Sequence, residues 1–147
     1  MHRLVTGALA VSAFTLVASA STSTSTRREP THTVWDSVYT DAQTVRGDSL
    51  YRQTCVKCHG PELAGGNDGS PLVGDPFLGN WDGQSLDQLY DRIRNSMPPD
   101  NPKSIPRDQV ADVLAFVLAK NHFPAGATPL TDDPARLKDI KVLKRKE

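Results

Sequence analysis

The chain has 147 residues, in which 17 Lys or Arg balance 17 Asp or Glu and hydrophobic residue types make up 37%. This length suits one domain with modest extensions, and the composition is that of a soluble globular chain, not of a membrane bundle or a disordered tail. The zero formal net charge argues against nucleic acid as the main partner, since nucleic-acid binding needs a basic surface. Two cysteines are too few for a multi-disulfide framework, so a small domain needs another source of stability.

Residues 1–20 are predicted to be a cleaved signal peptide. A basic start at Arg3 precedes an apolar run over residues 4–17, and Ala18-Ser19-Ala20 has the small-x-small pattern at which signal peptidase cuts. The alternative is a retained anchor, for which the apolar run is too short to span a bilayer comfortably. We therefore expect export to the periplasm, cleavage after Ala20 and no membrane span after processing.

Residues 21–38 read as a Ser/Thr-rich linker, and the chain from residue 39 onwards reads as helices and loops. Apolar residues at helical spacing predict three main helices, over about residues 41–55, 86–97 and 106–121. Thr40 or Asp41 caps the first, and Ser85 with Gln88 makes a capping box for the second. No segment shows the alternation typical of strands, so the expected fold class is all-α.

Glycines stand out in the first helix and in the segment after it. The expected inward positions of the helix are Ala42, Val45, Leu50 and Tyr51, whereas Gly47 in its interior costs about 1 kcal/mol relative to alanine and calls for a packing reason. Residues 60–84 hold seven glycines and three prolines, which predicts a long loop. Such a loop is uncommon in a compact domain unless it wraps around something.

Cys55-Val56-Lys57-Cys58-His59 is a C-x-x-C-H sequence, the signature of covalent attachment of a c-type haem. Cysteines at positions i and i+3 of a helical turn point to one side, where their thiols can meet the two vinyl groups of a porphyrin. His59 is then held under the iron and offers an imidazole nitrogen as the proximal ligand. The motif predicts one haem c, bound through two thioethers at Cys55 and Cys58, with His59 as an iron ligand.

Two other uses of a cysteine pair have less support in the sequence. A thiol-disulfide motif belongs in a βαβ setting, which is absent, and a zinc site needs a second pair of ligands. His32 and His122 lie far in sequence from Cys55 and Cys58, so neither rival is supported.

From about Thr40 to Asn121 the chain resembles the class I bacterial monohaem c-type cytochromes. It is most similar to the small cytochromes and cytochrome subunits that serve periplasmic quinoprotein dehydrogenases. The matching stretches are residues 47–60, 69–72, 96–98 and 110–116. The resemblance implies a cytochrome c fold over residues 39–123, with three main helices and a Gly/Pro-rich loop wrapped around the haem.

The same resemblance implies roles for residues outside the motif. Met97 is expected to be the iron ligand opposite His59, and Met/His coordination raises the reduction potential; the alternatives are that Met97 only fills the core or that His122 is the ligand. The carbonyl of Pro71 is expected to accept a hydrogen bond from the other ring nitrogen of His59, unless Pro71 is a simple loop proline. Leu72 is expected to line the haem edge.

Further positions gain a role from the resemblance. Gly47 would let Phe116 of the last helix cross the first helix closely, with Tyr51 packed beside it. Trp81 or Arg92 is a candidate for a hydrogen bond to a haem propionate, although either residue also suits ordinary core or surface.

The predicted function is electron transfer, in which the haem iron cycles between Fe(II) and Fe(III). Because no nucleophile or general-base constellation appears, we expect an electron carrier and not an enzyme in its own right. It is either a diffusible carrier or the cytochrome subunit of a dehydrogenase. The expected partners are redox proteins, a dehydrogenase as donor and an oxidase or another cytochrome as acceptor. The alternative is a haem-based sensor or gas-binding protein, which needs a labile sixth ligand in place of a stable bond to Met97.

Residues 124–147 are predicted to be a C-terminal extension with a basic end. Thr131-Asp132-Asp133-Pro134 predicts the cap and first turn of a short helix. Residues 136–147 hold six basic and two acidic residues, whereas residues 21–135 hold ten basic and fifteen acidic. The zero net charge is therefore a cancellation between an acidic domain and a basic tail, which is either a solvated end or a docking strap for an acidic partner.

Overall fold

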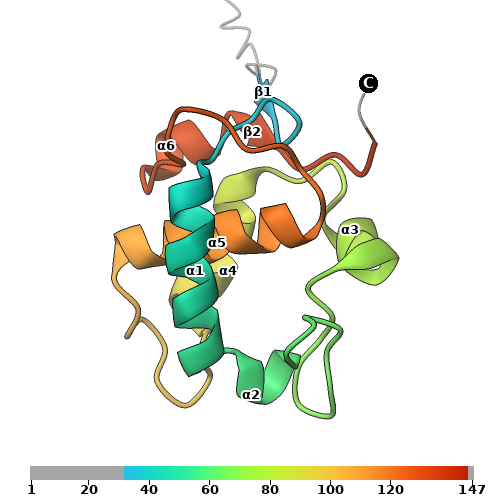
Figure 1. Ribbon diagram of the computed structural model, residues 1–147, viewed down its shortest axis with the longest axis vertical. Coiled ribbons are helices and arrows are strands. Elements are labelled where there is room, and N and C mark those ends of the chain that lie inside the picture. The colour runs from blue at the N-terminus through green and yellow to red at the C-terminus, as the bar shows by residue number, and fades with distance from the viewer. Residues whose placement is uncertain (1–31, 146–147) are drawn as a thin grey trace, which may run out of the picture.

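The computed structural model describes residues 32–145, which form six helices and two short strands (Figure 1). In chain order these are β1 (His32–Thr33), α1 (Asp41–Thr54), α2 (Val56–His59), α3 (Gly74–Trp81), α4 (Leu86–Ser96), α5 (Arg107–Lys120), α6 (Pro134–Leu137) and β2 (Ile140–Lys141). The predicted signal peptide, residues 1–20, lies outside the described residues, as does the start of the predicted linker. No helix within residues 32–145 is long and apolar enough to cross a membrane.

The three main helices are α1, α4 and α5, and the ends of each fall within one residue of the positions predicted from the sequence. At the start of α1, Thr40 and Gln43 form a capping box, in which each side chain accepts a hydrogen bond from the backbone N–H of the other residue. The capping box predicted at α4 is wrong. Ser85 does precede that helix, but its hydroxyl donates to the carboxylate of Asp87 and accepts from the side-chain amide of Gln88 at 3.3 Å, so it caps no backbone N–H.

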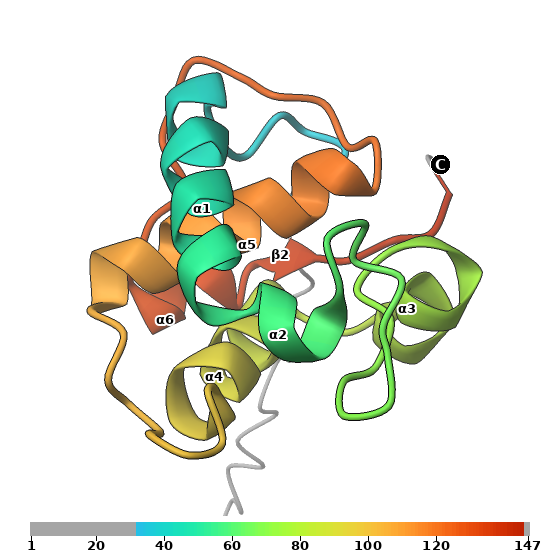
Figure 2. The same cartoon turned by 60° about the horizontal axis from the view of Figure 1, so that its bottom comes forward.

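The helices α1 and α5 cross steeply at the centre of the molecule (Figures 1 and 2). They touch at Gly47, where a Cβ would lie 2.0 Å from the carbonyl oxygen of Asp112 and 2.8 Å from the Cβ of Phe116. The rings of Tyr51 and Phe116 pack beside this point, with their centroids 5.2 Å apart. The role that the family resemblance implied for Gly47 is confirmed.

The buried face of α1 differs from the apolar pattern of its sequence. Gln43, Gly47 and Tyr51 are buried, whereas Ala42 and Val45 are exposed and Val45 keeps 71% of its surface accessible. The prediction that these two residues point inward is wrong. The face with Gly47 must meet α5 because only a glycine permits so close a crossing, and this turns Val45 towards solvent.

The segment of residues 60–84 is not a loop throughout, because it contains α3. Phe77 is 2% exposed and anchors this helix, and Trp81 lies one turn further on, with 6.4 Å between the two ring centroids. Phe77 and Trp81 have helical spacing, but glycines and prolines surround them in the sequence. The sequence therefore predicted a loop here and not a helix. Figure 2 shows the remaining loop between α2 and α3.

The two ends of the described chain meet in a parallel pair of strands. His32 of β1 lies opposite Ile140 of β2, although the sequence predicted no strand. Val34 and Val142, next to these strands, have no exposed surface. The indole N–H of Trp35 donates to the carbonyl oxygen of Leu143 at 2.9 Å. Residues read as linker and residues read as C-terminal extension therefore pack against each other.

The C-terminal segment is held to the helices by polar contacts as well. The short helix α6 begins as predicted, with the carboxylate of Asp133 accepting a hydrogen bond from the backbone N–H of Ala135. The Lys144 ammonium lies 3.0 Å from the carboxylate of Asp75, and the Lys144 backbone N–H donates to Asp82 at 2.8 Å.

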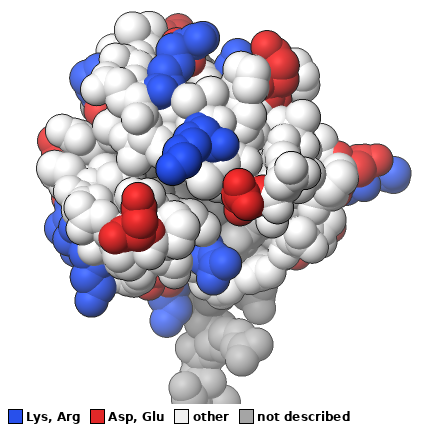
Figure 3. Space-filling model, turned by 90° about the horizontal axis from the view of Figure 1, so that it is seen from below, with Lys and Arg blue, Asp and Glu red and all other residues white. Residues whose placement is uncertain are grey.

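The opposite end of the molecule, seen from below in Figure 3, carries scattered charges of both signs on a mostly uncharged surface.

Replacing Gly47 with alanine is expected to lower the free energy of unfolding by about 3 kcal/mol, because the added methyl group has no room unless α1 and α5 separate. Urea-induced unfolding measures the effect. The control is Gly79→Ala in α3, where a Cβ meets nothing within 4 Å and alanine is the better helix former, so a gain of up to about 1 kcal/mol is expected. Equal effects of the two substitutions would contradict the close crossing.

Candidate haem-binding site

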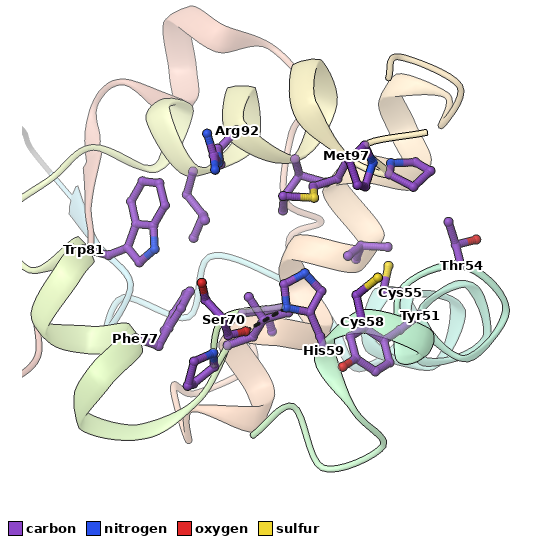
Figure 4. Close-up of a pocket in the computed structure, with 18 of the residues that line it drawn as sticks. Tyr51, Thr54, Cys55, Cys58, His59, Ser70, Phe77, Trp81, Arg92 and Met97 are labelled. Carbon is purple, nitrogen blue, oxygen red and sulfur yellow. Dashed lines mark hydrogen bonds between the residues drawn. The ribbon is translucent and has the colours of Figure 1, made fainter. Parts of the chain in front are cut away.

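The C-x-x-C-H motif lies at the turn where α1 ends and α2 begins. Cys55 stands between the two helices, and the backbone N–H groups of Cys58 and His59 both donate to its carbonyl oxygen, at 3.2 and 3.0 Å. This single turn places both thiols and the imidazole on the wall of one cavity of about 290 Å³ (Figure 4). The structure thus brings together the three side chains that the motif singled out.

The imidazole of His59 is oriented by a backbone carbonyl. Its Nδ1 lies 2.7 Å from the carbonyl oxygen of Ser70. A carbonyl oxygen can only accept a hydrogen bond, so Nδ1 carries a proton, and in the neutral form of such a ring the lone pair is on Nε2. A neutral imidazole held in this way is the form that binds iron.

The acceptor for His59 is Ser70 and not Pro71, which corrects the role implied by the family resemblance. The loop turns so that the peptide before Pro71 faces the ring, while Pro71 and Leu72 themselves line the cavity. The Leu72 backbone N–H donates to the carbonyl oxygen of Leu63 at 2.8 Å, which ties this part of the loop to the segment after α2.

Met97 stands across the cavity from His59 (Figure 4). Met97 is the C-cap residue of α4, and its backbone N–H donates to the carbonyl oxygen of Ile93 at 3.0 Å. The end of α4 therefore fixes the position of the Met97 backbone. His122, the reserve ligand considered from the sequence, is exposed and is not among the residues that line this cavity. Of the two candidate ligands, the structure brings only Met97 to the side opposite His59.

The other walls of the cavity are mainly apolar. They are formed by Leu72, Phe77, Trp81, Leu89, Ile93, Val113 and Val117, from the loop and from α3, α4 and α5. Arg92 and Trp81 lie at the end of the cavity away from the two thiols (Figure 4). This arrangement fits a haem, whose vinyl groups and charged propionates lie on different edges of a flat apolar ring, because it offers thiols at one end and a cation at the other.

Burial raises the pKa of the Cys55 thiol to about 11, with the neighbouring Cys58 adding to the effect. A catalytic thiol-disulfide motif works through a cysteine whose pKa is lowered, so that a thiolate is present near neutral pH. The environment of Cys55 does the reverse and keeps the free thiol protonated. It therefore speaks against the thiol-disulfide alternative.

Residues 42–117 match the family described as cytochrome c oxidase, cbb3-type, subunit III. The chain belongs to this family of c-type cytochromes. Its cofactor is haem c, covalently attached. The all-α cytochrome c fold and the family resemblance read from the sequence are confirmed.

The similarity of this cytochrome extends to individual proteins. Cytochrome c-551 of Bacillus subtilis (strain 168) is 32% identical over 85 residues, which cover 55% of this chain and 66% of that protein, slightly less than two thirds of its length. The crystal structure of the sulfane dehydrogenase SoxCD from Paracoccus pantotrophus matches with a TM-score of 0.44 and 21% identity, over 60% of this chain and 53% of that one. The chain's place in the family follows from the match over residues 42–117 alone.

Gly69 is a residue of the cytochrome's site to which the sequence assigned no role of its own. A Cβ at this position would lie 2.5 Å from the carbonyl oxygen of Cys58 and 3.0 Å from Nδ1 of His59. The loop can therefore approach the attachment motif only because residue 69 has no side chain. The sequence signal that could have identified Gly69 is its position directly before Ser70, in a stretch that resembles the family.

Replacing Gly69 with alanine is expected to push the loop away from α2 and to weaken the hydrogen bond between Nδ1 of His59 and the carbonyl oxygen of Ser70. We expect a loss of about 1–3 kcal/mol in unfolding free energy and a lower haem content per polypeptide, measured by chemical unfolding and by absorbance. Gly66→Ala is the control, because its Cβ would approach the same Cys58 carbonyl only to 3.3 Å. A normal haem content in Gly69→Ala would contradict the argument.

Proposed function

We propose that this cytochrome is exported to the periplasm, loses residues 1–20, and acts there as an electron-transfer protein with one haem c, either as a diffusible carrier or as the cytochrome subunit of a dehydrogenase. The observation that carries the proposal is the single cavity that Cys55, Cys58, His59 and Met97 all line. When bound, the haem supplies a one-electron couple between Fe(II) and Fe(III).

The proposed roles of the chain's own residues follow from their positions. Cys55 and Cys58 hold the cofactor as thioethers, and α2 keeps their spacing fixed. His59, with its Nδ1 bonded to Ser70, offers Nε2 as one axial ligand. Met97 offers its sulfur from the opposite wall. Two axial protein ligands leave no vacant position for a substrate or a gas, which supports electron transfer over sensing.

The apolar walls have the second proposed task of excluding water. Leu72, together with side chains of α4 and α5, covers the cavity, and a dry surrounding helps to set the reduction potential of a haem.

We propose redox proteins as partners, a dehydrogenase as donor and an oxidase or another cytochrome as acceptor. Co-purification of the holoprotein from its native cell tests this, and a dehydrogenase in the complex would favour the subunit version.

The mass of the intact protein tests export and attachment together. The full chain, produced in cells with c-type cytochrome maturation and recovered from the periplasm, is expected to begin at Ser21 and to carry the mass of one haem that survives acid extraction. Replacing both Cys55 and Cys58 with alanine is expected to abolish this mass gain. A wild-type protein recovered without covalent haem would contradict the proposal.

Replacing Met97 with leucine is expected to remove the weak far-red absorption band of a sulfur–Fe(III) bond and to lower the reduction potential, since Met/His coordination raises it. Leucine has a similar volume, so the fold should persist and the change reports ligation and not packing. Carbon monoxide is expected to bind the reduced variant and not the reduced wild type. A wild type that lacks the band and binds carbon monoxide would instead favour the sensor or gas-binding alternative.

A further inference from the structure

The side chain of Asn121, just after α5, hydrogen-bonds to three backbone groups in two segments of the chain. Its Nδ2 donates to the carbonyl oxygens of Val117, at 2.8 Å, and Leu72, at 2.9 Å. Its Oδ1 accepts a hydrogen bond from the backbone N–H of Gly74 at 3.0 Å. The residue is 7% exposed. Both donors of the amide and its oxygen are thus used to hold residues 72–74 against the end of α5.

The segment held by Asn121 is continuous with the one that contacts His59. Ser70, whose carbonyl oxygen accepts the hydrogen bond from Nδ1, is itself exposed, so packing does not fix it. Pro71, between Ser70 and Leu72, has a fixed φ and restricts the backbone of the residue before it. The place of the Ser70 carbonyl therefore depends on where the residues after it are held, by Asn121 at Leu72 and Gly74 and by the Leu63 carbonyl at the Leu72 N–H.

We propose that Asn121 is a positioning residue for the proximal ligand: by holding Leu72 and Gly74 it keeps the Ser70 carbonyl on Nδ1 of His59. This inference rests on the proposed function, in which His59 binds the iron. A firm hydrogen bond from Nδ1 raises the donor strength of the imidazole and so favours Fe(III). Loosening that bond is expected to raise the reduction potential.

Gln43 offers a matched control elsewhere in the fold. It is also a buried amide, 3% exposed, and it also holds one loop through two backbone groups. Its Nε2 donates to the carbonyl oxygen of Leu130 at 3.0 Å, and its Oε1 accepts from the Leu130 backbone N–H at 2.6 Å. Neither Gln43 nor Leu130 lines the haem cavity. Loss of the Gln43 hydrogen bonds should lower the free energy of unfolding without changing the surroundings of His59.

The test compares the holoproteins of wild type, Asn121→Leu, the milder Asn121→Ser and Gln43→Leu. The two readouts are the midpoint potential and the solvent exchange of the His59 Nδ1 proton, followed by NMR in the reduced protein. Asn121→Leu is expected to shift the potential upward and to speed exchange by about tenfold, with Asn121→Ser between it and the wild type. Gln43→Leu is expected to lower the unfolding midpoint and to leave both readouts unchanged.

Either of two results would overturn the proposal. One is an unchanged potential and exchange rate in the Asn121 variants, and the other is an equal change in Gln43→Leu. Should Asn121→Leu fail to yield holoprotein, Asn121→Ser alone decides between these results. Failure of the proposed function shows separately, because a wild type without covalent haem, or with an iron not bound by His59, is recognised before any variant is compared.

Discussion

The close crossing of α1 and α5 at Gly47 determines the positions of two walls of the haem cavity. One wall carries the attachment motif, and the other is formed by side chains of α5. The end of α1 leads directly into Cys55, so the direction of this helix sets the position of the attachment motif. Across the crossing, α5 contributes Val113 and Val117 to the cavity. A wider crossing would move the motif away from these side chains. The ion pair between Arg46 and Asp112 lies at the rim of the same crossing, but the Arg46 side chain is 58% exposed, so this pair adds little to stability.

Much of the fold could be predicted from the sequence, because the signals that end helices are local. Thr40, Pro106 and the prolines after Met97 fix helix boundaries through the backbone of their own turn. The orientation of α1 could not be predicted in this way, since it depends on a contact with α5 some sixty-five residues later. The apolar Val45 is exposed because the contact at Gly47 decides which face turns inward.

The site shows the same division between local and distant causes. The spacing of Cys55, Cys58 and His59 is fixed within one helical turn, so the motif identified these three residues at once. The acceptor of the His59 hydrogen bond is fixed by how a loop is held at Leu63 and at the end of α5, which no local pattern encodes. Ser70, Pro71 and Leu72 line the cavity, but the carbonyl that contacts His59 lies one residue earlier than the resemblance implied.

The pairing of β1 with β2 has a consequence for the order of folding. Trp35 and Leu143, which hydrogen-bond beside these strands, are 108 residues apart in the chain. Contacts over such a separation close a large loop and form slowly, whereas the turn around Cys55 needs only its neighbours. The attachment motif can therefore adopt its shape while the rest of the chain is still unfolded. The two strands pair only after residues 140–141 have come to lie beside residues 32–33.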